Sequence, residues 1–181
     1  MDTKEIKIPK ERVAVLIGVD GSVKKEIEER MKVKLDIDSQ EGDVIIFGED
    51  SLAVYECLNV VRAIGRGFNP EIAKILFDER YMFDLINIQG YVSKSKTHIT
   101  RIKGRVIGRE GMSRKMIEDS TETNIVVYGK TVGIIGKIEN VAVAKQAIEM
   151  LLEGSPHGNV FKWLDAKKKE LIRREFEGTG F

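Results

Sequence analysis

The pattern of hydrophobic and polar positions repeats once along the chain. At an offset of 90 residues, six positions of the segment 17–28 recur in the segment 107–118. They are Ile17, Gly18, Gly21, Lys25, Ile27 and Glu28 in the first copy, and Ile107, Gly108, Gly111, Lys115, Ile117 and Glu118 in the second. Self-similarity at a fixed offset is the signature of a duplicated structural unit. We therefore expect two copies of one fold.

Each copy predicts the same order of secondary structure. The apolar residues before the first glycine, as in 13–17, are typical of a strand, and a Lys-bearing helix follows the second glycine. Apolar and alternating runs then predict strands over 33–38 and 43–47, and over 124–128 and 131–135. Helices with one apolar face close the copies, over 54–64 and 144–151. The predicted unit is strand, Gly-x-x-Gly, helix, strand, strand, helix.

The segments outside the copies predict two further helices. Asn69 suits an N-cap and Pro70 the first helical position, so a connecting helix is expected from Pro70 to about Leu85. Glycine and proline over 154–158 interrupt the chain, and a basic helix is expected over 159–177. We expect a first module over 1–67, a linker over 68–90, a second module over 91–154 and the basic helix within 155–181.

Three Gly-x-x-Gly pairs occur, and their contexts differ. Gly133 and Gly136 lie inside an apolar strand run, where bulge or turn glycines are common. The other two pairs each open a helix, where glycines let a nucleic-acid backbone approach and free N–H groups favour phosphate. This is the loop of a KH module, which clamps about four nucleotides beside an apolar groove.

Three longer segments carry a more specific resemblance. They are AIGRGFNPEIAKILFDE in the linker, VVYGKTVGIIG in the second copy and SPHGNVFKWLD at its end. With the paired loops, they make the chain similar to the KH-domain ribosome-assembly factors of the partner-of-NOB group. The resemblance implies an α+β fold with two type I KH modules, each a three-stranded sheet packed by three helices. It also implies a connecting helix and a C-terminal basic helix.

The same resemblance implies a function. Such archaeal and eukaryotic factors bind the single-stranded 3′ end of small-subunit ribosomal RNA without being enzymes. It implies contact with the endonuclease that trims this end and, in archaeal members, with the α subunit of translation initiation factor two. Two departures from the general KH pattern stand out: Lys24 and Arg114 replace an apolar residue, and Lys32 and Glu122 replace a turn glycine.

Charge separates the two copies. Residues 1–90 carry 13 basic and 18 acidic side chains, a net charge of −5, whereas residues 91–181 carry 17 and 11, a net of +6. Around the loops, residues 13–25 have a net charge of +1 and residues 101–115 a net of +5. Chance clustering and a solvated face are the alternatives. Because cations bind phosphate, we expect the second copy to bind RNA and the first to bind it weakly or not at all.

The predicted RNA-binding residues therefore lie mainly in the second copy. They are Arg101, Lys103, Arg105, Ile107, Gly108, Arg109, Glu110, Gly111, Arg114, Lys115, Ile125 and Val127, with Gly18, Gly21, Lys24 and Lys25 as secondary candidates. Ile107, Ile125 and Val127 suit either an apolar groove or the core. The basic residues 167–169 and 173–174 suit either an extra RNA contact or a solvated helix face.

The remaining features favour binding over catalysis. Cys57, the single cysteine, lies on an apolar helix face, and His98 and His157 lack partners at metal-ligand spacing. Asp36, Asp38 and Glu41 suit a solvent-facing strand better than a Mg²⁺ site. We expect no cofactor, no metal and no membrane span, and a cytoplasmic protein. A general KH adaptor for messenger RNA or translation is the alternative function, and an RNA-processing enzyme is a third.

Overall fold

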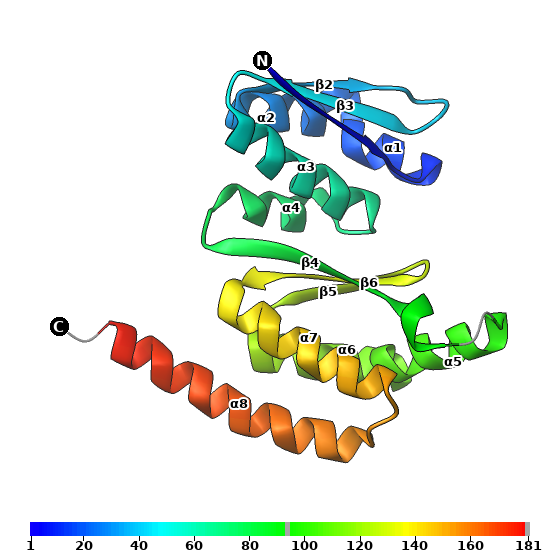
Figure 1. Cartoon of the computed structure of the whole chain (residues 1–181), viewed down its shortest axis with the longest axis vertical. Helices are drawn as coiled ribbons and strands as arrows, with labels where there is room; N and C mark the ends of the chain where they lie inside the picture. Colours follow the sequence, from blue (N-terminus) through cyan, green and yellow to red (C-terminus); the bar gives the residue numbers. More distant parts are fainter. Residues whose placement is uncertain (93–94, 180–181) are drawn as a thin grey trace. The chain divides into compact units, whose positions relative to one another are not determined.

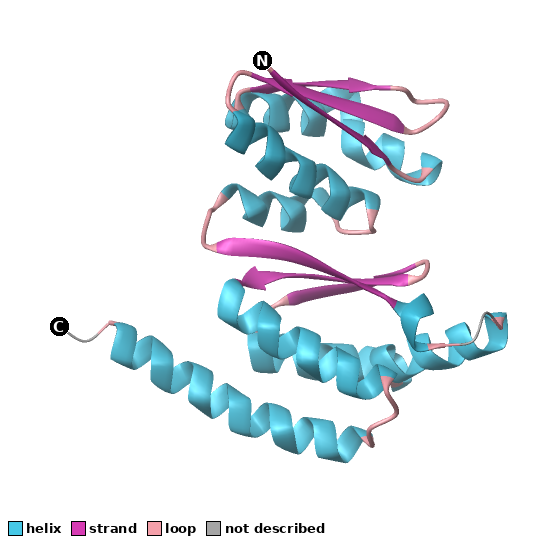
Figure 2. Cartoon of the chain, in the orientation of Figure 1, coloured by secondary structure: helices cyan, strands magenta, loops and turns pink. Residues whose placement is uncertain are grey.

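The computed structural model describes residues 1–92 and 95–179, and the chain divides into two compact units. The first unit is Met1–Phe83 and the second is Asp84–Phe181. Each contains one three-stranded sheet with helices packed against a face of it, as Figure 1 and Figure 2 show. The chain is therefore an α+β protein built from two similar units, as the repeat predicts.

The first unit follows the order strand, helix, helix, strand, strand, helix. Its elements are β1 (Asp2–Lys7), α1 (Lys10–Ile17), α2 (Ser22–Met31), β2 (Val33–Ile37), β3 (Asp43–Gly48) and α3 (Ser51–Gly65). The central strand β3 pairs antiparallel with both neighbours, so Ile46 lies opposite Lys4 on β1 and Leu35 on β2. β2 is therefore an edge strand with one free side.

The hydrophobic pattern correctly predicts which residues of the first unit are buried. On β2, Val33 and Leu35 are buried whereas Lys34 and Asp36 are exposed, which confirms the alternation. On α3, one face is fully buried against the sheet: Val54, Cys57, Val61 and Ile64. The core thus lies between the sheet and its three helices.

The segment before each Gly-x-x-Gly loop is a helix, so the predicted strand there is wrong. In α1, Val13 and Leu16 are buried whereas Ala14 is exposed, which is the spacing of one helix face. A run of five apolar residues fits a strand and a helix equally well. The first strand lies earlier in the chain, and this brings the repeated part of each unit to three helices.

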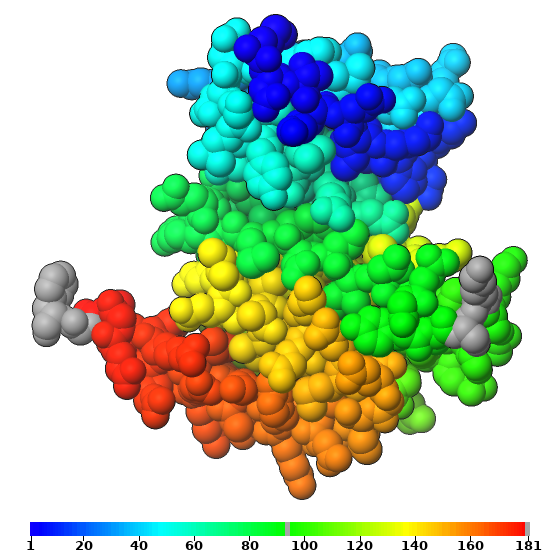
Figure 3. All heavy atoms as spheres, in the orientation of Figure 1, coloured from blue at the N-terminus to red at the C-terminus, as the bar shows by residue number. Residues whose placement is uncertain are grey.

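The second unit repeats this order and adds a long final helix. Its elements are β4 (Tyr81–Asn87), which begins three residues before the boundary at Asp84, α5 (Lys96–Ile107), α6 (Met112–Thr121), β5 (Asn124–Tyr128), β6 (Thr131–Lys137), α7 (Ile138–Leu152) and α8 (His157–Gly178). The strand order is β4-β6-β5, so β5 is an edge strand as β2 is in the first unit. The predicted basic helix is confirmed as α8, which packs on α6 and α7. Figure 3 shows α8, coloured orange to red, along the surface of this unit.

The helix predicted over 70–85 is wrong beyond residue 77. Asn69 caps α4 (Pro70–Ala73) as predicted, because its side-chain oxygen accepts from the Glu71 N–H at 3.0 Å. A single 3₁₀ turn follows over 74–77, and residues 81–87 form strand β4. The Tyr81 N–H donates to the Asp78 carbonyl oxygen at 3.0 Å, which closes a turn. Aromatic residues with strand propensity then begin the next sheet.

Packing explains the glycines inside β6, and backbone conformation explains the two positions where another residue replaces a turn glycine. Gly133 and Gly136 lie within β6, and a Cβ atom on Gly136 would lie 2.7 Å from a methyl carbon of Thr123. The pair is structural, but the predicted bulge or turn is wrong, because the register of β5 with β6 continues unbroken through Gly133. Lys32 and Glu122, which replace a turn glycine, still adopt the left-handed conformation at φ 55° and 50°. The helix ends keep their geometry at the cost of local strain.

Candidate nucleic-acid interface

The two loops have the same backbone conformation. The φ angles are 75°, 54° and 75° at Gly18, Asp20 and Gly21, and 74°, 54° and 76° at Gly108, Glu110 and Gly111. Each loop joins the end of one helix to the start of the next. Residues in right-handed and left-handed backbone conformations alternate along each loop. Successive backbone N–H groups then line a shallow concavity at a helix N-terminus, which can bind an anion. Backbone geometry alone gives both loops a phosphate-binding shape.

The two glycines of each loop are required for different reasons. A Cβ atom on Gly108 would lie 2.7 Å from the backbone nitrogen of Ser113, and one on Gly18 would lie 2.7 Å from that of Val23. A Cβ atom on Gly111 would meet nothing within 4 Å. The first glycine is needed for packing, whereas the second leaves an open surface that a phosphate backbone can approach.

A surface hollow of about 440 Å³ lies beside the second loop. It is lined by Arg101, Gly104, Arg105, Gly108, Arg109, Met112, Ser113, His157 and Phe161. The exposed side chains of Arg101 and Arg109 give it positive charge, whereas the first copy has Glu11 and Val19 at the matching positions. The two loops thus share a backbone but differ in charge, and only the second has an arginine at both positions.

Arg105 has a structural role within this hollow. Its Nε donates to the carbonyl oxygen of Leu151 at 3.0 Å and its Nη2 to that of Ser155 at 2.5 Å. The guanidinium therefore holds the end of α7 and the chain that leads into α8. Its predicted role in RNA binding is accordingly less direct than that of Arg101 or Arg109.

Arg12 performs the same task in the first unit from a different helix position. Its Nε donates to the Ile64 carbonyl oxygen at 2.9 Å and its Nη2 to that of Phe68 at 2.8 Å. Arg12 lies six residues before its loop glycine, whereas Arg105 lies three residues before Gly108. Self-comparison of the sequence misses this correspondence because the two arginines fall at different offsets.

The first turn of α8 forms one wall of the hollow. Nε2 of His157 lies 2.8 Å from the carbonyl oxygen of Arg105, in the last turns of α5. The ring of Phe161 meets that of His157 edge-on, with centroids 6.0 Å apart. The sequence predicted extra RNA contacts in the basic part of this helix. It did not predict that the aromatic residues at its start line the hollow.

The predicted contact residues follow α5, the loop, α6 and β5. Among them, Arg101, Arg109, Glu110, Arg114 and Lys115 are exposed, whereas Lys103, Ile107 and Val127 are partly exposed. Ile125 is only 2% exposed, so its side chain belongs to the core and does not line a groove. Ile107 and Val127 are the apolar side chains that remain accessible to a base.

A carboxylate joins the second helix of each unit to its edge strand. Oε1 of Glu118 on α6 accepts a hydrogen bond from the Ile125 N–H of β5 at 2.9 Å. Oε1 of Glu28 on α2 accepts one from the Leu35 N–H of β2 at 2.8 Å. The recurrence of this glutamate at the 90-residue offset was visible in the sequence. Its contact became apparent only once the strand edge was placed.

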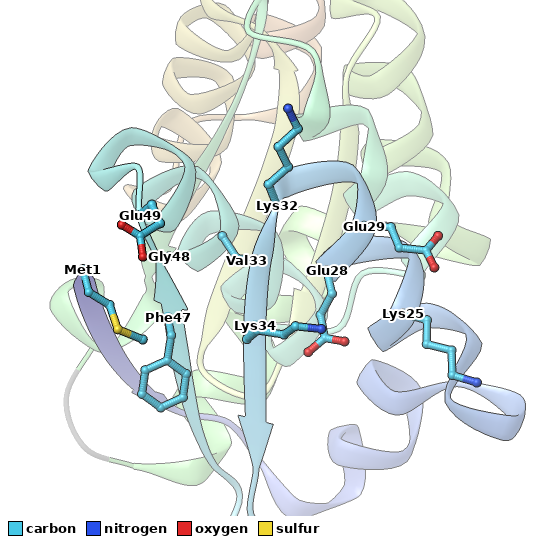
Figure 4. Close-up of a pocket in the computed structure, with 10 residues that line it drawn as sticks. All are labelled: Met1, Lys25, Glu28, Glu29, Lys32, Val33, Lys34, Phe47, Gly48 and Glu49. Atoms are coloured by element: carbon cyan, nitrogen blue, oxygen red, sulfur yellow. The ribbon is translucent and has the colours of Figure 1, made fainter.

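The first unit has a larger hollow, of about 770 Å³, between α2 and the β2–β3 strands (Figure 4). Three lysines and three glutamates line it, namely Lys25, Lys32, Lys34, Glu28, Glu29 and Glu49. In Figure 4, Lys34 points toward Glu28, and Met1 and Phe47 lie on the opposite side of β2. The balanced charge gives this hollow little attraction for a polyanion. Of the secondary candidates, Lys25 is exposed and Lys24 partly exposed.

Four basic residues of α8, namely Lys167, Lys169, Arg173 and Arg174, form ion pairs along the same helix. Lys167 and Arg174 both contact Glu170, at 3.2 and 2.8 Å, and Lys169 contacts Asp165 at 3.4 Å. These contacts hold the pKa of Glu170 below its usual value, chiefly through the Lys167 hydrogen bond. The arrangement favours the solvated-face interpretation of this segment over a continuous cationic track.

Other chemistry-bearing residues are accounted for by packing. Cys57 is fully buried, and burial raises the pKa of its thiol to about 12. Among residues 1–92 and 95–179, no three His, Cys, Asp or Glu side chains are grouped to hold a metal ion. No helix of the described chain is long and apolar enough to cross a membrane.

Comparison with known proteins assigns both units to KH-domain models. Residues 3–63 match a KH-domain model, and residues 82–169 match a model of the eukaryotic type I KH domain found as the second domain of PNO1. A KH domain-containing protein of Methanocaldococcus jannaschii is 50% identical over 176 residues, which cover 95% of this chain and 77% of that protein. The chain belongs to the PNO1/Dim2 family of tandem KH-domain proteins.

More distant members of the PNO1/Dim2 family extend the comparison. The pre-rRNA-processing protein pno1 of Aspergillus fumigatus is 25% identical over 169 residues, covering 89% of this chain and 66% of that protein. A crystal structure of an a/eIF2α–aDim2p–rRNA complex from Pyrococcus horikoshii contains a chain with 45% identity and a TM-score of 0.87. The match covers 93% of this chain and 95% of that one. Both KH units of the family are thus present here.

Proposed function

We propose that this protein is a non-catalytic ribosome-assembly factor that binds single-stranded ribosomal RNA through the loop of its second unit. The observation that carries the proposal is the cationic hollow beside Gly108–Gly111, formed by a phosphate-binding backbone with Arg101 and Arg109. Membership in a family of pre-rRNA-processing proteins supports the choice of ribosomal RNA. The rRNA in the complex of the Pyrococcus horikoshii relative supports it as well.

The finer part of the proposal concerns the RNA 3′ end. A KH groove reads about four nucleotides, so it suits a short unpaired segment such as the end of a chain. We propose that the protein holds the 3′ end of small-subunit rRNA and presents or shields it for a separate maturation endonuclease. The a/eIF2α in the relative's complex supports the α subunit of initiation factor two as a further partner.

Loop variants test the assignment to the second unit. Arg109→Asp combined with Glu110→Asp places two like charges where phosphate would bind, and we expect at least a tenfold loss of affinity for single-stranded RNA. Val19→Asp creates the same Gly-Asp-Asp-Gly loop in the first unit and should change affinity less than about twofold. Equal losses in a fluorescence-anisotropy titration at fixed salt would overturn the assignment.

A separate experiment tests the choice of RNA. Crosslinks between the protein and total cellular RNA, mapped at nucleotide resolution, should concentrate at the 3′ end of small-subunit rRNA and its precursor. The Arg109/Glu110 variant should lose these crosslinks, whereas the Val19 variant should keep them. Crosslinks spread over messenger RNAs, with none at that end, would instead support a general KH adaptor.

A further inference from the structure

The edge of β5 carries a fixed carboxylate. Glu118 projects from α6, and its Oε1 accepts from the Ile125 N–H at 2.9 Å. The side chain of Ile125 is in the core, while β5 has no strand on its outer side. The bond therefore places the carboxylate against the free edge of the strand and orients it there.

The groups left open at this edge are mostly acceptors. In an antiparallel ladder, alternate residues direct their N–H and C=O groups away from the partner strand. Since the backbone N–H of Ile125 points outward, the backbone N–H of Val127 does too. The Val127 N–H is the nearest donor left open at this edge. Oε2 of Glu118 has no hydrogen bond or ion pair with the described residues. An acceptor without a partner among the described residues thus lies between α6 and the edge of β5.

We propose that Glu118 selects a base bound at the edge of β5 by accepting a hydrogen bond from an exocyclic amine. An ionised carboxylate only accepts, so it pairs with the amine of cytosine, adenine or guanine. Uracil presents carbonyl oxygens on both sides of its single N–H, and these oppose a carboxylate. The inference rests on the proposed function and adds to it a preference against uracil.

The surroundings of Glu118 make this role compatible with binding a polyanion. Arg114 lies one turn earlier on α6, at a spacing that places the two side chains on the same helix face. Arg114 is exposed and can bind a phosphate while Glu118 meets the base attached to it. The Ile125 N–H fixes the carboxylate before RNA arrives, so little conformational freedom is lost on binding.

The first unit supplies a matched control. Glu28 makes the same bond to the Leu35 N–H, at 2.8 Å. Its groove has balanced charge, and Lys34 points toward its carboxylate in Figure 4. Glu28 therefore shares the structural contact of Glu118 in a hollow whose lysines are balanced by glutamates. A purely structural role would make Glu28→Gln and Glu118→Gln lower the free energy of unfolding alike.

Cytosine and uracil provide the sharpest probe, because the two pyrimidines have the same ring size and differ at this edge. We expect the full chain to bind five-nucleotide oligo(C) about tenfold more tightly than oligo(U). Glu118→Gln keeps a carbonyl oxygen for the Ile125 N–H but places an amide donor toward the base. The variant should abolish or reverse the preference, whereas Glu28→Gln should leave it unchanged.

An RNA-side change tests the inference without altering the protein. Oligomers of N4,N4-dimethylcytidine lack both amine hydrogens and should bind the wild-type chain as weakly as oligo(U). Equal affinity of the wild type for oligo(C) and oligo(U), or an unchanged preference in Glu118→Gln, would overturn the inference and leave the proposed function standing. Failure of the wild type to bind any of these RNAs at low salt would overturn both.

Discussion

The two units share a fold and a loop conformation but differ in what surrounds the loop. The φ angles of the matching loop residues agree within 1°. Around the second loop, arginines stand at positions where the first unit has Glu11 and Val19. Both units have a backbone that can bind phosphate, and we propose that the side chains around it decide where RNA binds. The shape of a Gly-x-x-Gly loop is therefore insufficient evidence of RNA binding.

Alanine at the first loop glycine should produce the largest change in stability. Gly108→Ala and Gly18→Ala each place a Cβ atom 2.7 Å from a backbone nitrogen, in a conformation that only glycine adopts easily. We expect each to lower the free energy of unfolding by about 3 kcal/mol. Gly111→Ala meets no atom and should cost about 1 kcal/mol. Denaturant unfolding of the full chain measures all three, and an equal cost at Gly108 and Gly111 would contradict the packing explanation.

Removal of either arginine clamp should have the next largest effect. Arg105→Ala and Arg12→Ala each leave one carbonyl group at a helix end and one in the chain after it without their guanidinium donor. We expect a loss of about 2 kcal/mol in each case, measured by denaturant unfolding. If Arg105→Ala keeps full stability yet weakens RNA binding, Arg105 is a direct contact and its structural role is wrong.

Glycine at the two strained helix ends should stabilise both units slightly. Lys32→Gly and Glu122→Gly relieve a left-handed conformation that side chains adopt at a cost. Glycine also increases the entropy of the unfolded chain, so the expected net gain is about 0.5 kcal/mol per site. Thermal unfolding of the single and double variants should show additive increases. A decrease at one site would show that its side chain contributes contacts that outweigh the strain.

The smallest expected effect is a loss of stability at acidic pH, and it arises in the first unit. Asp38 accepts from the backbone N–H groups of Glu41 and Gln40, and these bonds hold its pKa below the usual value of 3.8. The stabilisation is complete above pH 4 and is lost as the pH falls through the lowered pKa. The matching turn of the second unit, at Gly129 and Lys130, has no such carboxylate.

The control for this effect is Asp38→Asn. At pH 7 the variant should be slightly less stable than the wild type, and the difference should vanish at low pH. Hydrogen exchange can follow the amides of each unit separately. A difference that stays constant between pH 7 and pH 2 would contradict the assigned role of the Asp38 carboxylate.

The sequence predicted the duplicated units and most of their core. The alternation of apolar and polar residues on β2 fits only a strand, and the apolar spacing on α3 fits only a helix. Each pattern therefore predicts directly which side chains are buried. The run 13–17 is too short to distinguish helix from strand, and the helix predicted over 70–85 overlooked the aromatic residues that begin β4.

The site was predictable only in part. The loop glycines and Arg109 follow from local pattern and charge. The clamps of Arg12 and Arg105 depend on where distant carbonyl groups come to lie, and the wall formed by His157 and Phe161 depends on how α8 packs. Glu118 recurred in the repeat, but its meaning required the edge of β5. Contacts between residues that are far apart in the chain form only in the folded structure, and no fixed sequence spacing predicts them.

An NMR titration tests the central claim most directly, because it observes both loops in one molecule. The full chain, labelled with ¹⁵N, is titrated with a five-nucleotide single-stranded RNA at low salt. The account predicts that the amide signals of Gly108–Gly111 shift first and saturate, while those of Gly18–Gly21 move little at the same concentrations. Shifts at Gly18–Gly21 that appear at equal or lower RNA concentrations would contradict the claim that charge assigns RNA binding to the second unit.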